Sequence, residues 1–315
     1  MKETSIELKS YAKINLSLDV LGINDDGYHR VEMIMHQVDL HDDVTVKWEP
    51  QDSGIKVMTN RKYLPVDERN LAWKAAGLML DRFKTSGKVT IDIKKRIPVA
   101  AGLAGGSANA ASVMLALSRL WELDISVKEL CGIGAALGAD IPFCIRGQAA
   151  SNKILGEKFN KDPEAGTCAL AEGIGTDLTM LPPVSCYIVL AKPPVSCSTR
   201  EIYKAVDHVT IPVRPDTKEL VLAIKQKNWP IIIKNMVNTL ENVTLRRYPI
   251  VVYTKNKMNS GCGAQAVLMS GSGPTVFGVF LDKNDAKACY LMMKEEFRDS
   301  FMSHTTLIVQ RRFKQ

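Results

Sequence analysis

The segment Ile97–Val113, "IPVAAGLAGGSANAASV", places three glycines within five residues directly before a helix-forming run. It follows "KVTIDIKKR", whose alternating apolar and polar residues predict a strand that ends near Arg96. The first turn of a helix has unpaired backbone N–H groups, and the helix dipole favours negative charge there. Glycine has no Cβ and lets the backbone approach an anion closely. The segment therefore predicts a phosphate-binding loop in front of a helix that opens around Ser107.

The spelling of this loop excludes two familiar nucleotide-binding patterns. It contains neither G-x-x-x-x-G-K-[ST], the Walker loop, nor G-x-G-x-x-G, the dinucleotide fingerprint. A glycine-rich turn between a strand and a helix can also serve close packing of the helix alone. Taken by itself, the stretch leaves an anion site and a packing role open.

Length and composition are those of a soluble globular protein with two domains. The chain has 315 residues, of which 46% are hydrophobic and 24% charged. Lysine and arginine exceed aspartate and glutamate by 41 to 34, but the excess is scattered through "KKR", "TKNK" and "QRRFK". We therefore expect no nucleic-acid partner, and an anionic small substrate explains the positive balance equally well.

The cysteines and the N-terminal sequence indicate the cytoplasm. None of the seven cysteines stands in a C-x-x-C pair or at metal-ligand spacing, so we expect most to be buried small hydrophobes in a reducing compartment. The first twenty residues alternate in polarity and include acids, unlike a secretory or transit peptide. No run approaches the roughly 18 apolar residues that a membrane helix needs.

Periodicity predicts strands and helices in both halves, and so an α+β protein. The first fifty residues alternate as strands do, and "RNLAWKAAGLMLDRFKTSG" predicts a helix with Leu71, Ala75, Leu78 and Leu80 on its buried stripe. Further helices are expected to start at Ser126 and Ser198, each followed three residues later by glutamate as a capping partner. We also expect a polar surface excursion from about Gly147 to Thr167 and a last strand at "HTTLIVQRR".

Three other stretches carry candidate chemistry. "GADIPFCI" places Asp140 among apolar residues, either as a buried structural acceptor or as an acid held for chemistry. Lys13 interrupts an otherwise half-buried strand in "SYAKINLSL", although a lysine in a strand is usually solvated. "MSGSGPTVFGVF", Met269–Phe280, is a second glycine and serine turn, which could also be a plain tight hairpin.

In chain order, "AKINL", "DGYH", "PVAAGLAGGSANAA", "LGADIPF", "VSCSTREIY" and "MSGSGPTVFG" resemble the motifs of the GHMP kinase superfamily. The resemblance covers most of residues 10–150 and returns at residues 169–206, 238–249 and 269–280. It implies a two-domain α+β fold, with a ribosomal-protein-S5-like ATP-binding and catalytic domain over residues 1–160 and a ferredoxin-like domain over residues 161–315. It also implies an ATP-dependent small-molecule kinase.

The resemblance assigns roles in phosphoryl transfer to particular residues. Asp140 would accept the proton of the substrate hydroxyl, and Lys13, lying against Asp140, would keep that carboxylate ionised and offset charge on the transferred group. Residues that would contact ATP are Pro98, Val99, Ala100, Ala101, Gly102, Leu103, Ala104, Gly105, Gly106, Ser107 and Ala108 of the loop, Asn70 and Lys95 near the adenosine, and Gly271, Ser272, Gly273 and Thr275 of the second turn. Magnesium is expected to arrive with ATP, with no protein side chain as its ligand.

The motifs "DGYH" and "VSCSTREIY" imply a pocket for a small-molecule substrate that carries cytidine. Tyr28 and Tyr203 would stack on the cytosine, His29 would contact its polar edge, and Asn15 would lie near the reacting end. The alternative for Tyr28 and His29 is a turn that covers a sheet edge, and for Tyr203 a core-facing helix residue. For Asn70 and Lys95, a helix cap and a solvated lysine are the alternatives.

Two departures from the family pattern and three other functions bear on this interpretation. Ala108 stands where relatives commonly have a second serine, so one hydroxyl contact is missing, and the excursion before "LAEGIG" is longer than usual. The competing functions are a homoserine or mevalonate type of GHMP kinase, a catalytically silent nucleotide-binding protein on the same fold, and a nucleic-acid binder. The "DGYH" motif argues against the other GHMP kinases. The presence of both Lys13 and Asp140 argues against a silent protein, and the lack of a basic aromatic face argues against a nucleic-acid binder. The sequence does not indicate an oligomeric state.

Overall fold

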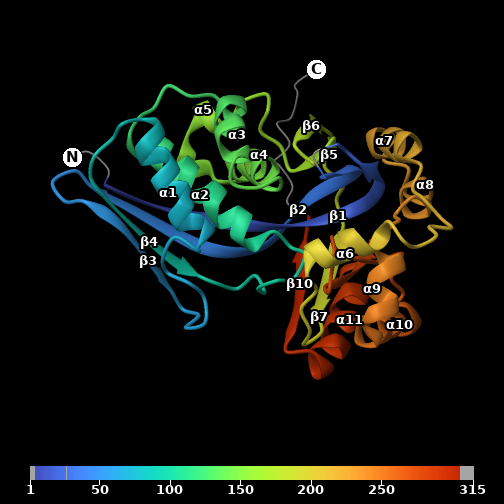
Figure 1. Cartoon of the computed structure of the whole chain (residues 1–315). Coiled ribbons are helices and arrows are strands. Elements are labelled where there is room, and N and C mark those ends of the chain that lie inside the picture. Colours follow the sequence, from blue (N-terminus) through green and yellow to red (C-terminus); the bar gives the residue numbers. More distant parts are fainter. Residues whose placement is uncertain (1–3, 26, 306–315) are drawn as a thin grey trace, which may run out of the picture. The chain divides into compact units, whose positions relative to one another are not determined.

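The structure is a computed structural model that describes residues 4–25 and 27–305, and these form two compact units (Figure 1). Unit 1 contains the chain up to Ala12 together with Leu40–Val99 and Ala104–Gly166, and unit 2 contains Lys13–Asp39, Ala100–Leu103 and the chain from Thr167 onward. The units thus interleave along the chain. These units are defined by contacts between residues and not by family domains. The predicted boundary between the two family domains near residue 160 therefore stays a prediction.

Unit 1 contains a small sheet with helices on one of its faces (Figure 1). β4 (Lys88–Lys94) pairs antiparallel with the second half of β2 (His29–Glu49) and parallel with β3 (Gly54–Thr59). Alternate residues of β4 are buried, as expected for a strand covered on one face. The helices of this unit are α1 (Leu71–Arg82), α2 (Gly105–Leu120), α3 (Val127–Ala135), α4 (Ile141–Ser151), the short 3-10 helix at Lys153–Leu155 and α5 (Glu157–Asn160).

The buried stripe of α1 differs from the predicted one. Ala72, Ala75, Ala76 and Met79 are the buried residues of this helix, whereas Leu71, Leu78 and Leu80 are only partly buried. Three of the four buried residues of α1 are alanines, and α1 packs on α2, which is itself buried over most of its length. Larger side chains would hold the helices apart, and the leucines therefore lie at the margin of the contact.

The predicted surface excursion after Gly147 was wrong in its first part. Gly147–Ala149 are buried in α4, and the side-chain amide of Gln148 exchanges hydrogen bonds with the backbone of Tyr11 at 3.1 and 3.0 Å. Asn152 does the same with the backbone of Lys9, at 2.9 and 3.0 Å. These amides fasten the end of α4 to β1 (Ser5–Ile23), a long-range pairing that hydrophobic periodicity does not reveal.

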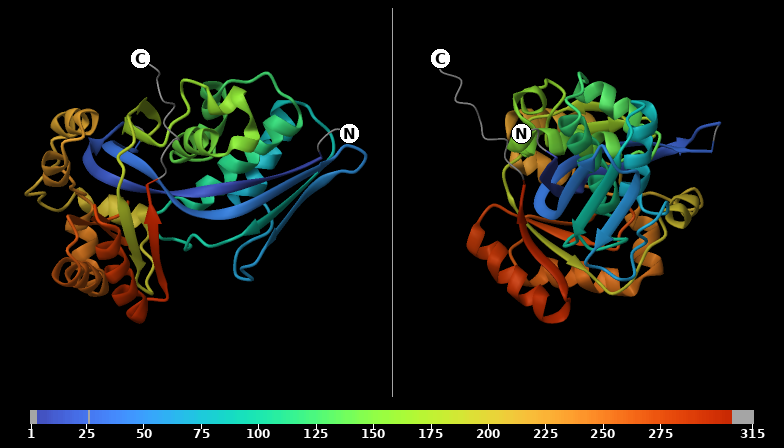
Figure 2. Two further views of the ribbon diagram at one scale, coloured as in Figure 1. Left: turned by 180° about the vertical axis from the view of Figure 1, so that it is seen from behind. Right: turned by 90° about the vertical axis from the view of Figure 1, so that its left-hand side faces the viewer.

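Unit 2 contains a four-stranded antiparallel sheet in the order β10-β7-β9-β8. Its strands are β7 (Tyr187–Lys192), β8 (Ala266–Met269), β9 (Val276–Phe280) and β10 (Asp299–His304), and β5 (Cys168–Glu172) and β6 (Asp177–Met180) join the first half of β2. The helices are α6 (Thr199–Val206), α7 (Thr217–Gln226), α8 (Trp229–Lys234), α9 (Glu241–Arg247), α10 (Pro249–Gly261) and α11 (Lys283–Glu296). Both α10 and α11 pack on one face of the sheet (Figures 1 and 2).

Several local predictions are confirmed. Ser126 caps α3 in a full capping box with Glu129, and the Ser198 hydroxyl caps α6 by accepting from the Glu201 N–H at 3.4 Å. All seven cysteines are buried, and burial raises the pKa of the Cys131 thiol to about 11. The last strand begins earlier than expected, at Asp299, and most of "HTTLIVQRR" lies outside the described residues. Among the described helices, none combines the length and apolar character that crossing a bilayer requires.

His36 is a buried polar anchor in unit 2. Its Nε2 accepts a hydrogen bond from the Val184 N–H at 3.1 Å, and its Nδ1 lies 2.8 Å from the carbonyl oxygen of Gln37. These contacts fix a neutral ring that donates from Nδ1 and accepts at Nε2. Burial lowers the pKa of His36 to about 4, because the charged form would lose its hydration.

This shift makes the free energy of unfolding depend on pH. In the unfolded chain His36 binds a proton below about pH 6.5, whereas the folded protein binds it only near pH 4. Stability should therefore fall by roughly 3 kcal/mol between pH 6.5 and 4 and stop falling, for this group, below that range. Urea unfolding of the protein and of His36→Gln across these pH values measures the difference, with the exposed His208→Gln as control. A His36→Gln variant with the same pH dependence as the parent would contradict the assignment.

Candidate active site

The glycine-rich loop has left-handed backbone at alternate positions. The φ angles of Ala100, Gly102 and Ala104 are 51°, 74° and 54°. This conformation costs an alanine about 1–2 kcal/mol, so the surrounding structure must hold it in place. Alternation of left- and right-handed residues turns successive N–H groups to one side and forms an anion-binding concavity. Ala104 caps α2 without a side-chain hydrogen bond, which leaves the first-turn N–H groups without a side-chain acceptor from the cap.

Gly102 is held against the second glycine and serine turn, within unit 2. A Cβ on Gly102 would lie 2.2 Å from the Ser270 carbonyl oxygen, so only glycine fits there. The Ser270 hydroxyl donates to the Gly102 carbonyl at 2.9 Å. The side-chain amide of Asn238 donates to the carbonyls of Met269 and Gly271, both at 2.8 Å. These hydrogen bonds hold the second glycine and serine turn in place. The two motifs are thus in contact at Gly102 and Ser270.

Lys13 and Asn15 form a buried polar pair in the same unit. Lys13 is 5% exposed, and its Nζ donates to Asn15 Oδ1 at 2.7 Å. The Lys13 backbone N–H donates to the carbonyl of Leu103 in the loop at 3.2 Å. A buried ammonium beside the loop is costly to desolvate, which marks it as a candidate functional group and rules out the solvated alternative.

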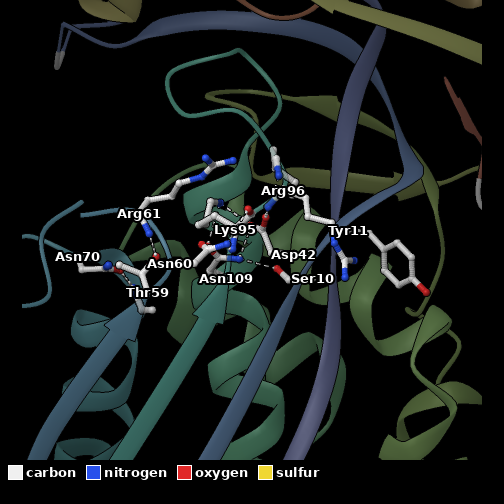
Figure 3. A network of polar contacts seen from close by, with 12 residues as sticks. Ser10, Tyr11, Asp42, Thr59, Asn60, Arg61, Asn70, Lys95, Arg96 and Asn109 are labelled. Atoms are coloured by element: carbon white, nitrogen blue, oxygen red, sulfur yellow. Dashed lines mark hydrogen bonds and ion pairs between the residues drawn. The ribbon is translucent and has the colours of Figure 1, made fainter. Parts of the chain in front are cut away.

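Lys95 lies in a buried network at the start of the loop, within unit 1 (Figure 3). Its Nζ forms an ion pair with Asp42, which is fully buried, and also donates to Asn109 Oδ1 at 3.2 Å. Asp42 accepts further hydrogen bonds from the backbone N–H groups of Arg96 and Ile97, at 2.7 and 2.8 Å, and from Asn109 Nδ2 at 2.9 Å. Lys95 is therefore not a solvated lysine.

This network also brings positive charge to the first turn of α2. A Cβ on Gly105 would lie 3.1 Å from Lys95 Nζ and 3.0 Å from Ile97 Cγ2. Glycine at this position thus lets the ammonium lie directly beside the helix start, where an anion is also favoured by the dipole. Asn109 links the network to Ser10 by a 3.0 Å hydrogen bond.

Other predicted ATP contacts have structural partners. Asn70 caps α1: its Oδ1 accepts from the Ala72 N–H at 2.9 Å and its Nδ2 donates to the Pro65 carbonyl at 2.8 Å, so the capping alternative is confirmed. The Ser272 hydroxyl pairs with that of Thr199 at 2.9 Å. Thr275 is 1% exposed, and within the described chain its hydroxyl has no hydrogen-bond partner.

Ala108, the position where relatives have serine, is fully buried in the core of unit 1. The missing hydroxyl therefore leaves the apolar packing of α2 intact.

Asp140 begins α4 as its N-cap residue, but its side chain makes no capping hydrogen bond. Asp140 is partly exposed and belongs to unit 1, whereas Lys13 belongs to unit 2. Their pairing accordingly stays a prediction.

Of the predicted cytidine-binding residues, His29 and Tyr203 lie side by side within unit 2, together with Asp207, which was not predicted. The rings of His29 and Tyr203 are 5.2 Å apart between centroids and tilted by 58°, and Tyr28 is 62% exposed. His29 Nε2 lies 3.0 Å from both carboxylate oxygens of Asp207. Asp207 follows Tyr203 by one helical turn, a spacing that could have indicated it from the sequence.

Within residues 4–25 and 27–305, no group of three or more histidine, cysteine, aspartate or glutamate side chains is placed to hold a metal ion. The residues that the sequence missed are Asp42, Asn109, Ser270 and Asp207. Of these, Ser270 and Asn109 stand inside motifs already singled out, whereas Asp42 had no signal of its own.

Two family models match this chain: the GHMP kinases N terminal domain over residues 70–148 and the GHMP kinases C terminal domain over residues 220–299. A 4-diphosphocytidyl-2-C-methyl-D-erythritol kinase of Clostridium botulinum is 45% identical over 95% of this chain and 100% of its own length. The chain belongs to the 4-diphosphocytidyl-2-C-methyl-D-erythritol kinase family. A further member, from Lachnospira eligens, is 41% identical over 96% of this chain and 98% of its own.

Solved structures agree with membership of this kinase family. A crystal structure of 4-(cytidine 5'-diphospho)-2C-methyl-D-erythritol kinase is 28% identical and has a TM-score of 0.75, covering 96% of this chain and 100% of that one. A homoserine kinase from Cytophaga hutchinsonii, at 17% identity and a TM-score of 0.68 over 98% and 96% of the two chains, shows the shared fold alone. The two-domain GHMP kinase fold is thus confirmed, and the protein is an ATP-using small-molecule kinase.

Gly102→Ala tests the contact between the two motifs. The new Cβ would meet a backbone oxygen at 2.2 Å, and a positive φ adds strain, so we expect a loss of at least about 1–3 kcal/mol in stability and weaker ATP binding. Thermal unfolding and calorimetric titration with ATP measure the two effects. Gly132→Ala in α3 is the matched control, because nothing lies within 4 Å of its added Cβ. Unchanged stability and ATP affinity in Gly102→Ala would contradict the contact.

Proposed function

We propose that the protein transfers the γ-phosphoryl group of ATP to the 2-hydroxyl of 4-diphosphocytidyl-2-C-methyl-D-erythritol, a cytoplasmic step of non-mevalonate isoprenoid biosynthesis. The observation that carries the proposal is 45% identity to a kinase of that name over 95% of this chain. The His29 and Tyr203 rings add a site where a base could stack.

The loop from Pro98 to Ala108 holds the phosphates in this proposal. Its support is the alternating left-handed backbone and the uncapped first turn of α2, which together offer N–H donors to an anion. The Lys95 ammonium, paired with Asp42, lies beside Gly105. Magnesium delivered with ATP would neutralise charge on the phosphates.

Asp140 is the general base. Its carboxylate takes the proton of the substrate hydroxyl while that oxygen forms a bond to the γ-phosphorus, and the bond between this phosphorus and the β,γ-bridging oxygen breaks to release ADP. Lys13 offsets the charge that gathers on the transferred group. Its burial and its fixed hydrogen bond to Asn15 support a positioned cation.

The cytosine stacks between Tyr28 and Tyr203, with His29 at its polar edge and Asn15 near the reacting end. The tilted pair of His29 and Tyr203 rings, 5.2 Å apart between centroids, supports this. Asp207 fixes the orientation of the His29 ring through the 3.0 Å contacts at Nε2.

The direct test incubates the protein with magnesium, γ-labelled ATP and the cytidine substrate, with homoserine and mevalonate in parallel. Label in the cytidine compound alone is the expected result. Transfer only to another acceptor would keep the kinase and discard the cytidine pocket. ATP binding without any transfer would favour a catalytically silent protein.

Asp140→Asn is expected to lower kcat by about 10²–10⁴-fold, because the amide cannot accept the proton. The dissociation constant for ATP should stay nearly unchanged. Asp282→Asn is the matched control: Asp282 is also an N-cap aspartate, and asparagine caps a helix equally well. Full turnover in Asp140→Asn would remove Asp140 from the mechanism.

Tyr28→Ala is expected to raise the KM for the cytidine substrate by about 5–100-fold and to leave the KM for ATP unchanged, since stacking of one base contributes about 1–3 kcal/mol. Steady-state kinetics in both substrates measure the split. Tyr253→Ala removes another exposed ring, on α10, and should change neither constant. Equal effects on both substrates would mean that no base stacks on Tyr28.

A further inference from the structure

Unit 2 contains a pocket bounded by α6 and α9. Its volume is about 600 Å³, within the range of about 300–1,000 Å³ that is usual for small-molecule sites. The lining residues are Glu201, Lys204, Ala205, His208, Val209, Val243, Arg246 and Arg247.

The pocket has a strongly basic wall. Lys204 and His208 come from α6 and the residues after it, and Arg246 and Arg247 from the last turn of α9. Within the described chain, none of the four side chains has a hydrogen bond or an ion pair. Glu201 is the one acidic residue of the lining. Lys204, Arg246 and Arg247 outnumber this single carboxylate, so the lining has a net positive charge that an anion in the pocket would offset.

An apolar surface completes the lining. Val243 is 3% exposed, and Ala205 and Val209 are partly buried beside it. A pocket that combines a few convergent charged groups with apolar surface suits an organic ligand better than a bare inorganic ion. His208 supplies the one ring among the lining residues, which include no tyrosine, tryptophan or phenylalanine.

The pocket lies on a different face of α6 from the predicted cytidine site. Glu201, Lys204, Ala205 and His208 follow the spacing i, i+3, i+4, i+7, which places them along one side of the helix. Tyr203 and Asp207, which contact His29, share another side. The same helix therefore separates the two sites.

We infer that this pocket binds a small organic anion that carries a diphosphate group. Two arginines and a lysine supply three permanent positive charges, and a guanidinium pairs with phosphate oxygens through two parallel hydrogen bonds. The histidine ring donates a further hydrogen bond in either protonation state. The site does not rest on the proposed kinase reaction.

The ordinary alternative is that these cations only stabilise the C-terminal ends of α6 and α9. Cations in a last turn contribute about 0.3–1 kcal/mol each by interaction with the helix dipole. That role requires no ligand and no apolar surface beside the charges. The two explanations differ in whether the full protein binds a diphosphate at this place.

The experiment titrates the full chain, with its glycine-rich loop saturated by a non-hydrolysable ATP analogue, with inorganic diphosphate and with n-pentyl diphosphate in a calorimeter. The test variant is Arg246→Gln with Arg247→Gln, which removes two charges but keeps hydrogen-bonding length. The matched control is Lys218→Gln with Lys225→Gln, which removes two exposed charges from α7. Thermal unfolding establishes that both variants are folded.

We expect one equivalent of n-pentyl diphosphate to bind, more tightly than inorganic diphosphate, with affinity at least about tenfold weaker in the arginine variant and unchanged in the control. Absence of binding, or equal binding by both variants, would leave only a solvated basic surface and overturn the proposal. Equal affinity for the two probes would overturn an organic ligand. Binding of an acidic peptide but of neither diphosphate would also overturn it, in favour of a protein partner. Phosphoryl transfer by the arginine variant is measured separately and reports on the kinase proposal alone.

Discussion

The contact between the Gly102 backbone and the Ser270 carbonyl is the constraint on which the candidate active site depends. It leaves no room for a Cβ, and the Ser270 hydroxyl returns a hydrogen bond to the Gly102 carbonyl at 2.9 Å. Asn238 holds the Ser270 turn from behind, and the Lys13 N–H holds Leu103 beside it. Left-handed backbone at alanine is strained, and these contacts stabilise the loop in that conformation.

The start of the loop is held by a buried network of hydrogen bonds around Asp42. Asp42 is a buried carboxylate with both oxygens saturated, and it joins the end of β4 to Lys95 and Asn109 (Figure 3). Loss of one partner would leave a buried charge uncompensated, so the arrangement is rigid. Phosphoryl transfer needs positioning and electrostatics more than reactive side chains. A loop whose backbone is held by such contacts suits that chemistry.

Helix α6 connects the predicted specificity of the enzyme with the inferred anion pocket. One side carries Tyr203, whose ring lies 5.2 Å from that of His29, and Asp207, which holds the same histidine. Another side carries Lys204 and His208 of the basic pocket. A ligand in the pocket would contact the element that supports the cytidine site, although the two surfaces are separate.

The features that depend on neighbouring residues could be predicted from the sequence: the alternating strands, the caps at Ser126 and Ser198, and the glycine loop before α2. The order of the motifs indicated the family. The partners of the polar side chains are visible only in the folded protein. There Lys95 pairs with Asp42, Asn70 caps α1, and His29 contacts the carboxylate of Asp207. Gln148 joins α4 to β1 by hydrogen bonds. Local rules follow from backbone geometry within a few residues, whereas a buried polar group takes its partner from segments far away in the chain, which no single-sequence pattern records.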